Sequence, residues 1–345
     1  MKKSTVIFIT LIAALCLCSC GKPEHSNGEY AGLEPERLIA ADSTGKGAAG
    51  QLFGEYVAKR ASEISGGMLT IDYYPNGELG GDADLIRQMQ ANDIQIVVCQ
   101  TAPTVMFIPE MAVFDLPMVF SKYDGNTIDV VLNGEGEFAQ RLRDAYDKAG
   151  LTLLGFLQNA TYRLTTSNTP LNGLDDFRGL QIRTMENSNH MEFWQAIGAE
   201  PTPLAWAEVY ISLQNGMIDA QENAADTCVG ASFDEVQKYL ACTDHILYCN
   251  QICMNSDAWN SLAPEYREVL RQAVTEAREY MRPQLKSLDE DSKTALTDGG
   301  MTLIRYDGGF FDSVLNLDGV KTLYGKIDIQ TNGLASLLKN ELNGG

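Results

Sequence analysis

Apolar and polar residues recur with two different periods along the first part of the chain, and the two periods alternate. Apolar residues repeat at helical spacing over residues 48–64 and 85–89, with Asp82 expected to cap the second helix. Strand-like apolar runs lie before, between and after these helices, over residues 38–41, 69–74 and 94–98. The order strand, helix, strand, helix, strand predicts α/β units built on a mainly parallel sheet.

A second cycle of the same kind begins at Leu151. Helical spacing returns over residues 191–197 and 206–213, and Gly198 and Gly216 are expected to end these helices. Strand-like runs accompany them over residues 151–156, 162–165, 179–184 and 217–220. The return of the pattern predicts a second α/β unit.

The clearest helical pattern follows Pro264, a residue that suits the first turn of a helix. Its apolar stripe continues to Met281, over about 18 residues or roughly 27 Å, long enough to bridge two lobes. A chain of 345 residues also exceeds the usual size of a single core, so two lobes are expected. The predicted first lobe comprises residues 33–160 and 249–288, and the second comprises residues 161–248 and 289–345.

The N-terminus has the pattern of an export signal. Lys2 and Lys3 precede an almost wholly apolar run over residues 6–17. This run is shorter than the roughly 20 apolar residues that a membrane-spanning helix needs. A short positive start followed by a short apolar stretch predicts a signal peptide over residues 1–19.

The end of this signal resembles a lipid-attachment site. Ser19 supplies the small residue wanted before a cleaved bond, and Cys20 follows it. We therefore expect Cys20 to be the first mature residue and to carry the lipid. Residues 20–32 are mostly polar without apolar periodicity, which is typical of a flexible tether. The protein is expected to be exported and held at the outer surface of a membrane by this lipid.

The composition is globular, and the charge is strongly acidic. Without Lys2 and Lys3 the chain keeps 24 of its 26 basic residues against 46 acidic ones, a formal charge of −22. Nucleic acids and anionic membrane surfaces are therefore not expected as partners. An acidic protein binds an anion only through a local basic site, so single arginines in apolar surroundings become the candidates.

The cysteines and histidines give no metal motif. The expected mature chain has five cysteines besides Cys20, an odd number, and the sequence leaves open whether a bridge forms among the last four. No CxxC pair occurs after Cys20 and the three histidines are far apart in sequence, so no metal site is predicted. The five are Cys99, Cys228, Cys242, Cys249 and Cys253.

Residues 45–50, Gly-Lys-Gly-Ala-Ala-Gly, match the GxGxxG pattern between a predicted strand and helix. Asp72 follows at a distance that suits a ribose contact in a dinucleotide-binding enzyme. An exported protein meets little nicotinamide cofactor, so we favour a tight turn whose helix N-terminus faces a cleft. No cofactor is predicted. Nucleophile motifs such as GxSxG and HExxH are absent from the sequence, and catalysis has no positive support.

Two arginines, Arg163 and Arg183, stand in or beside strands that are otherwise apolar or small. A guanidinium group offers a planar fork that matches a carboxylate with two hydrogen bonds. Asn223 and the Gln100-Thr101 step lie with Arg183 at the ends of predicted strands. Ligands of open α/β sheets bind beyond such ends, which predicts a carboxylate site there.

The sequence resembles the DctP family, the solute-binding proteins of TRAP transporters, over nearly the whole mature chain. The first matching block contains YPNGELGG at residues 74–81 and FDLPMVF at residues 114–120. The second contains GLQIR at 179–183, GAEPTP at 198–203, EVY at 208–210, LQNGMID at 213–219 and EN at 222–223. The sequence departs from the usual pattern at Thr161 and Ala224, where the family often has glycine and proline.

The resemblance implies an α/β periplasmic binding protein fold of two lobes, joined by hinge strands and a long helix, which close on an organic acid. It implies that the acid's carboxylate pairs with the arginine at position 183. The further ligand contacts are expected at Arg163, Asn223, Glu78, Gln100, Thr101 and Tyr210, whereas Trp206 is assigned to core packing. The implied partners are the membrane subunits of a TRAP transporter, and the binding protein is expected to be a monomer.

The ligand itself is not fixed by the sequence. A uronate-type sugar acid and a C4-dicarboxylate stay equally open, followed by sialic acid and keto acids. Two other classes of protein are kept as alternatives. One is an exported enzyme that acts on acidic sugars, and the other is a ligand-binding lipoprotein that serves a receptor.

Overall fold

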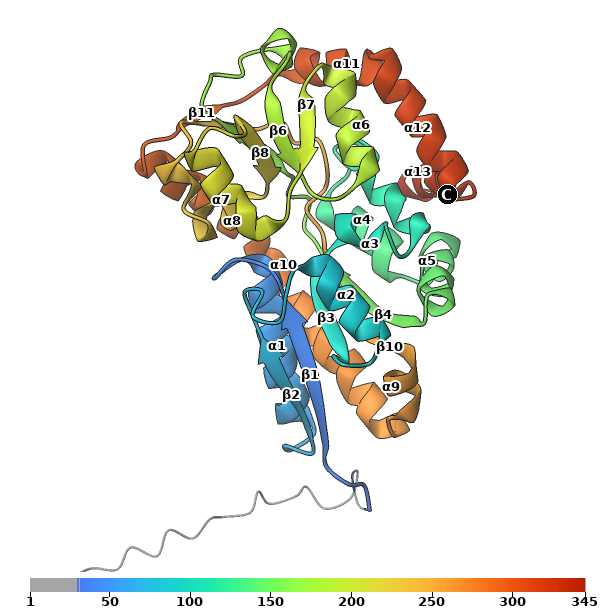
Figure 1. Ribbon diagram of the computed structural model, residues 1–345. Helices are drawn as coiled ribbons and strands as arrows, with labels where there is room; N and C mark the ends of the chain where they lie inside the picture. Colours follow the sequence, from blue (N-terminus) through green and yellow to red (C-terminus); the bar gives the residue numbers. More distant parts are fainter. Residues whose placement is uncertain (1–29, 31, 345) are drawn as a thin grey trace, which may run out of the picture.

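The computed structural model describes residue 30 and residues 32–344, so the predicted signal peptide and Cys20 lie outside the described residues. Two β-sheets with surrounding helices form two lobes, one above the other in Figure 1. The first-lobe sheet has the order β2-β1-β3-β10-β4, made of β1 (Glu36–Asp42), β2 (Leu69–Tyr74), β3 (Ile96–Gln100), β4 (Leu151–Leu157) and β10 (Asn250–Asn255). The second-lobe sheet has the order β11-β9-β5-β8-β6-β7, made of β5 (Leu164–Ser167), β6 (Gln181–Thr184), β7 (Glu200–Pro203), β8 (Ala220–Asn223), β9 (Tyr239–Ala241) and β11 (Thr302–Ile304).

Both sheets are mixed, although the strands from which a mainly parallel sheet was predicted do run parallel, since β1 pairs in parallel with both β2 and β3. In the first lobe β10 runs antiparallel to both β3 and β4, and in the second β5 runs antiparallel to both β8 and β9. Strand β10 enters its sheet from the second lobe without a crossover helix, and a crossover is what a parallel pairing requires. The two-lobed α/β architecture itself is confirmed.

Helices surround both sheets, and the four shorter helices predicted from apolar spacing are found. Gly81 rather than Asp82 is the N-cap of α2, because Asp82 is already the first helical residue. The helices of the first half of the chain are α1 (Ala49–Ile64), α2 (Asp82–Gln90), α3 (Thr101–Thr104), η1 (Pro109–Asp115), α4 (Gly125–Asn133), α5 (Glu137–Lys148) and η2 (Leu174–Phe177). Those that follow are α6 (Ser188–Ile197), α7 (Trp206–Gln214), α8 (Ala225–Gly230), η3 (Phe233–Glu235), α9 (Ser256–Ser261), α10 (Pro264–Asp298), α11 (Gly308–Asn316), α12 (Asp318–Gln330) and α13 (Leu334–Leu342).

The long helix α10 has 35 residues, which corresponds to about 52 Å, and it is almost twice as long as predicted. It packs on α1 and β4 in the first lobe and on α8 and β11 in the second. Its apolar stripe was expected to end at Met281, but Leu285 and Leu296 extend the buried face beyond Pro283. The buried Lys293, paired with a neighbouring carboxylate, interrupts the apolar pattern there. None of the described helices meets the length and apolarity that a membrane span requires.

Two extended segments of the chain, one containing Tyr162 and the other containing Leu247, run side by side from one lobe to the other. These two residues form an isolated antiparallel bridge. The backbone N–H of Arg163 donates to the carbonyl of Ile246 at 2.9 Å, next to that bridge. With α10, these segments make three connections, which is the construction of a hinge. The crossing also fixes Arg163 at the junction of the lobes.

The C-terminal helices touch both parts of the molecule. Helix α12 packs on α6, whereas α13 packs on α4 and α5. The predicted division assigned all of residues 289–345 to the second lobe. Helix α13, however, packs on α4 and α5, which lie in the sequence between the first-lobe strands β3 and β4. The exact lobe boundaries stay a prediction.

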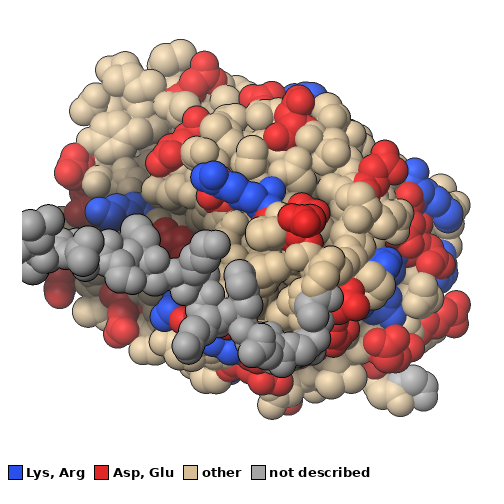
Figure 2. All heavy atoms as spheres, turned by 90° about the horizontal axis from the view of Figure 1, so that it is seen from below, with Lys and Arg blue, Asp and Glu red and all other residues tan. Residues whose placement is uncertain are grey.

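All five cysteines of the described chain are free and buried, so the bridge that the sequence left open does not form among them. Burial raises the pKa of Cys99 and Cys228 to about 12, which keeps both thiols protonated near neutral pH. Seen from below in Figure 2, acidic side chains are spread over the surface and basic ones stand in small separate groups.

Candidate functional site

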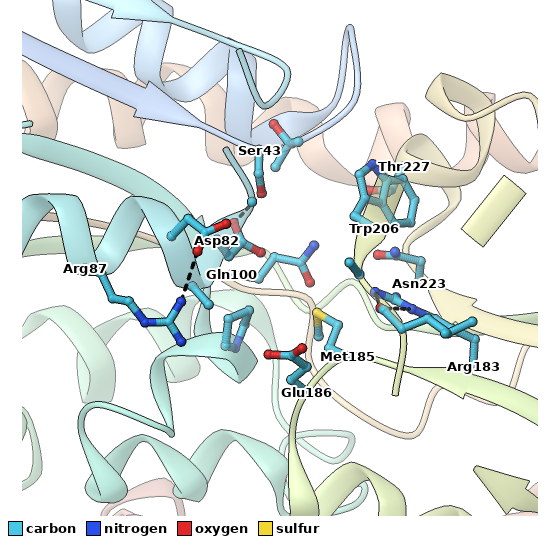
Figure 3. A pocket seen from close by; sticks show the side chains of 17 residues that line it. Ser43, Asp82, Arg87, Gln100, Arg183, Met185, Glu186, Trp206, Asn223 and Thr227 are labelled. Carbon is cyan, nitrogen blue, oxygen red and sulfur yellow. Dashed lines mark hydrogen bonds and ion pairs between the residues drawn. The ribbon is translucent and has the colours of Figure 1, made fainter. Parts of the chain in front are cut away.

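A cavity of about 280 Å³ lies between the lobes, and both contribute its walls. This volume is near the lower end of small-molecule pockets, which span about 300–1,000 Å³, so the cavity suits a small ligand. The first lobe contributes Ser43, Asp82, Asp84, Arg87 and Gln100, and the second contributes Arg183, Met185, Glu186, Trp206, Asn223 and Thr227. Figure 3 shows these two sets facing each other across the cavity.

Arg183 lies on β6, and only part of its guanidinium group is hydrogen-bonded to the described residues. Its Nε and Nη2 donate to the carbonyl of Leu204 at 3.0 and 2.8 Å. Its Nη1 is buried and has no hydrogen-bond partner among the described residues. The guanidinium carbon lies 5.7 Å from the centre of the Trp206 ring, within the range of a cation–π contact. Leu204 and Trp206 therefore hold a donor that lacks an acceptor.

Burial has the largest influence on the ionisation of Arg183 and lowers its pKa to about 10. The group still carries its charge at neutral pH. Leaving a buried polar group unpaired costs about 1–3 kcal/mol, and more for a charged group. An anionic ligand that accepts from Nη1 would remove this penalty, so the residue favours carboxylate binding.

The structure brings together some of the predicted site residues and not others. Arg183, Gln100 and Asn223 meet in the cavity wall. Arg163 does not line it, because Glu222 and Gln100 hold its guanidinium. The remaining three also lie outside the lining: Thr101 is buried at the start of α3, Glu78 is exposed in the turn after β2, and Tyr210 donates from α7 to Glu235 at 2.7 Å.

Several residues of the wall were missed from the sequence. Trp206 was assigned to core packing, and it does contact Phe233 edge to face, but another part of the ring faces the cavity. Ser43 follows β1, Asp82 begins α2 and Thr227 lies in α8, so the three residues come from segments far apart in the sequence. Only the folded chain brings them together, so sequence spacing carried no signal for them.

The glycine-rich turn makes a contact between the two lobes. The N–H of Ala48 donates to the carbonyl of Gly45, which closes the turn before α1. The free N–H of Ala49 at the start of α1 then donates to Asp226 at 2.8 Å. Asp226 belongs to α8 of the second lobe and is buried. The helix N-terminus predicted to face a cleft thus donates to a buried carboxylate of the other lobe.

Replacing Asp226 by alanine is expected to weaken the binding of every ligand about 2- to 30-fold, because the two lobes lose a helix-cap contact worth about 0.5–2 kcal/mol that joins them in this arrangement. Calorimetry checks the affinity, and small-angle scattering checks whether the ligand-free ensemble becomes more open. Asp124→Ala is the matched control, since Asp124 caps α4 without joining the lobes. Equal affinity in the Asp226 variant and the parent would contradict this role.

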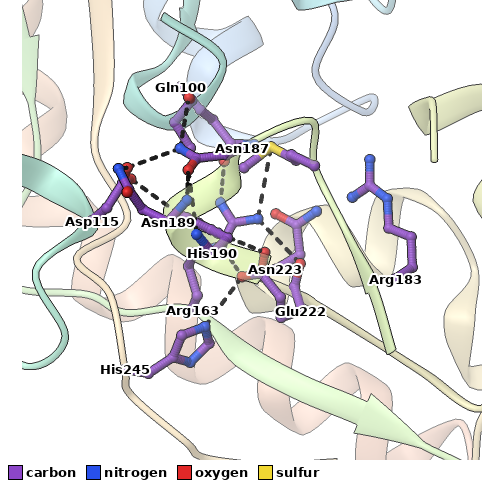
Figure 4. A network of polar contacts seen from close by, with 12 residues as sticks. Gln100, Asp115, Arg163, Arg183, Asn187, Asn189, His190, Glu222, Asn223 and His245 are labelled. Atoms are coloured by element: carbon purple, nitrogen blue, oxygen red, sulfur yellow. Dashed lines mark hydrogen bonds and ion pairs between the residues drawn. The ribbon is translucent and has the colours of Figure 1, made fainter. Parts of the chain in front are cut away.

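A buried polar network lies beside the cavity, and Glu222 is at its centre (Figure 4). Its carboxylate pairs with Arg163 and lies 3.2 Å from both His245 Nε2 and His190 Nδ1. The other nitrogen of His190 lies 3.1 Å from Asp115 of η1. These five side chains are almost wholly inaccessible to solvent. Because η1 follows β3 and α6 follows β6, the network links the lobes.

The charges of this network compensate one another. Burial disfavours ionisation of Glu222, but the charges of Arg163 and His190 outweigh it and hold its pKa well below the usual value. Burial likewise disfavours the charged form of His190. The charge of Glu222 and hydrogen bonds with Asp115 and Glu222 overcome this and raise the pKa of His190 to about 9.

The described residues contain no group of three or more His, Cys, Asp or Glu able to hold a metal ion.

Protein stability is expected to fall as the pH rises from 7 to 9.5. The pKa of His190 is higher in the folded state, about 9, than in the unfolded chain, about 6.5. Its stabilising contribution is therefore fully present below pH 6.5 and is lost as the pH passes through 9. The predicted loss is on the order of 2–3 kcal/mol. Urea unfolding at several pH values measures it, and a His190→Gln variant that kept the same slope would refute it.

A ligand-sized cavity between two hinged α/β lobes, with an unpaired arginine donor in its wall, defines a two-lobed ligand-binding protein of the periplasmic binding protein fold. The chain belongs to the bacterial extracellular solute-binding protein family 7, DctP, which matches it over residues 42–307. This confirms the resemblance seen in the sequence. The family consists of solute-binding proteins of TRAP transporters and not of enzymes.

Known solute-binding proteins are similar to this chain in sequence, and a solved one is similar in fold. The sialic acid-binding periplasmic protein SiaP of Vibrio cholerae is 32% identical over 219 residues, covering 63% of this chain and 67% of SiaP. The C4-dicarboxylate-binding protein DctB of Bacillus subtilis is 28% identical over 253 residues, covering 73% of this chain and 70% of DctB. The sugar acid binding protein DctPAm of Advenella mimigardefordensis, solved with galactonate, superimposes with a TM-score of 0.83 at 22% identity, covering 90% of this chain and 98% of DctPAm.

Proposed function

We propose that this protein is the extracytoplasmic solute-binding subunit of a TRAP transporter and that it captures a small organic acid between its lobes. The observation that carries the proposal is the buried, unpaired Nη1 of Arg183 in the cavity wall. A carboxylate is the acceptor that a guanidinium fork fits best. Sialic acid, C4-dicarboxylates and galactonate, named for the three relatives above, all carry one.

Binding would proceed by closure of the hinge on the acid. Arg183 and Asn223 contact the ligand from the second lobe and Gln100 contacts it from the first, so only the closed form makes all three contacts. The ligand then shifts the population toward the closed form. Arg163 would act indirectly in this scheme, because it orients Gln100 from the hinge. The closed protein would deliver the acid to membrane subunits made of other chains.

We further propose that a lipid on Cys20 holds the protein at the outer face of the membrane, in the periplasm or at the cell surface. The pattern of residues 1–20 supports this. One chain supplies both walls of the cavity, which supports a monomer as the binding unit.

The proposal is tested by thermal-shift measurements against a panel of organic acids and their uncharged amides or alcohols. An acid of the right class is expected to raise the melting temperature, since saturating ligand stabilises the folded state by several kcal/mol. The matching amide or alcohol is expected to have no effect. If none of the acids shifts the transition, or if the neutral compounds shift it equally, the proposed function is wrong.

A further inference from the structure

The two sides of the cavity differ in chemical character, as Figure 3 shows. Arg183 and Asn223 stand on one side, and Ser43, Asp82 and Gln100 stand opposite. The first side presents a cationic donor. The second presents a carboxylate and two neutral polar groups. A ligand that spans the cavity therefore needs an anion at one end and hydrogen-bond donors at the other.

Asp82 is the charged group of the second side. It begins α2, and its Oδ1 accepts a hydrogen bond from the hydroxyl of Ser43. No lysine or arginine of the described chain forms an ion pair with it. Its carboxylate lines the cavity and is half-buried there, and this burial raises the pKa of Asp82 to about 6. At neutral pH Asp82 is mostly ionised, and the charges of Arg183 and Arg163 favour this form without making an ion pair with it.

The neighbouring charges do not turn this side into an anion site. Arg87 also lines the cavity, but Asp84 pairs with it at 3.0 Å and compensates its charge. Glu186, exposed at the rim, adds another carboxylate to the lining. A second carboxylate of a ligand would meet like charges here, which disfavours it. A hydroxyl group would instead find acceptors.

We propose that the ligand is a hydroxylated monocarboxylic acid whose carboxylate pairs with Arg183 and whose distant hydroxyl groups donate to Asp82. Asp82 is then the residue that selects against acids with a second carboxylate at that end. The inference rests on the proposed function, because it assumes an acid in this cavity. It separates the two ligand classes that the sequence left open, in favour of sugar acids over C4-dicarboxylates.

The test is calorimetric titration of the purified protein with matched acids. D-gluconate and D-glucarate, and likewise galactonate and galactarate, differ only in that the second acid has a carboxylate where the first has a hydroxymethyl group. Succinate, malate and hexanoate complete the set. The tightest ligand is expected among the hydroxylated monocarboxylates, at least tenfold tighter than its diacid and than the other three.

The outcomes separate the two proposals. If no acid binds, the proposed function fails. If acids bind, but succinate, malate, hexanoate or a diacid binds as tightly as the best hydroxylated monocarboxylate, this inference alone is overturned.

A variant then assigns the selection to Asp82. Asp82→Asn removes the charge and adds an amide donor, so the preference for the monocarboxylate over its diacid is expected to shrink at least tenfold. Asp93→Asn, an exposed carboxylate just after α2, is the control for net charge and is expected to keep the parental ratio. An unchanged ratio in Asp82→Asn would overturn its role. If that variant does not fold, the comparison in the parent protein still decides the ligand class.

Discussion

Replacing Arg183 by alanine is expected to raise the dissociation constant for the organic acid by about 30- to 4,000-fold. The reason is that removing one partner of a buried, hydrogen-bonded charge pair costs about 2–5 kcal/mol, and each 1.4 kcal/mol is a factor of ten. A ligand bound with micromolar affinity would become hard to detect. Isothermal titration with the best acid of the panel measures the change.

Two further variants make this result specific. Arg178→Ala removes an arginine just before β6 that is mostly exposed and paired with Asp175 at 3.0 Å, so it should bind as the parent does. Arg183→Lys keeps the charge but loses the planar fork, and an intermediate affinity is expected. Affinity in Arg183→Ala within threefold of the parent would show that the carboxylate binds elsewhere.

Replacing Glu222 by glutamine is expected to lower the free energy of unfolding by about 3–5 kcal/mol, because it leaves the charges of Arg163 and His190 buried without their common partner. The substitution hardly changes the volume, so the loss reports charge rather than packing. Urea unfolding at pH 7 measures it.

The matched control is Glu192→Gln, which breaks the ion pair with Lys326. Both side chains of that pair are exposed, so the expected change is below about 1 kcal/mol. If the free energy of unfolding fell by similar amounts in the two variants, the charges around Glu222 would not stabilise the folded state more than an exposed ion pair does.

The sequence predicted the local elements well where apolar residues face a nearby core. Helices α1 and α6 follow directly from apolar spacing because each packs one side on a core, and strand β4 follows from an apolar run that packs on both sides. The prediction failed where a buried face includes a charged residue, and where an element packs on a partner that is distant in the sequence. Helix α10 continues past Pro283, and its buried face includes Lys293. Strand β10 pairs with β3 of the first-lobe sheet, which is distant from it in the sequence.

The candidate site divides in the same way. Arg183 was found because it interrupts an apolar strand, and Asn223 because it lies at the end of a predicted strand, where ligands bind. The family resemblance pointed to the same residues. Asp82 gave no such signal, since a carboxylate at the start of a helix is common on any surface. Its importance arises only when closure of the lobes brings it opposite Arg183.

The network around Glu222 was equally hidden. His190 and His245 are 55 residues apart and were discounted as isolated, yet both contact one carboxylate. Such convergence depends on which strands are neighbours in the sheet, and the sequence did not determine that order.

The most direct measurement is a crystal structure of the protein with the tightest-binding acid of the panel. A carboxylate oxygen of the acid is expected about 2.7–2.9 Å from Nη1 of Arg183, between the closed lobes. A complex in which that nitrogen stays unpaired, while the carboxylate of the acid is held by other groups, would contradict it.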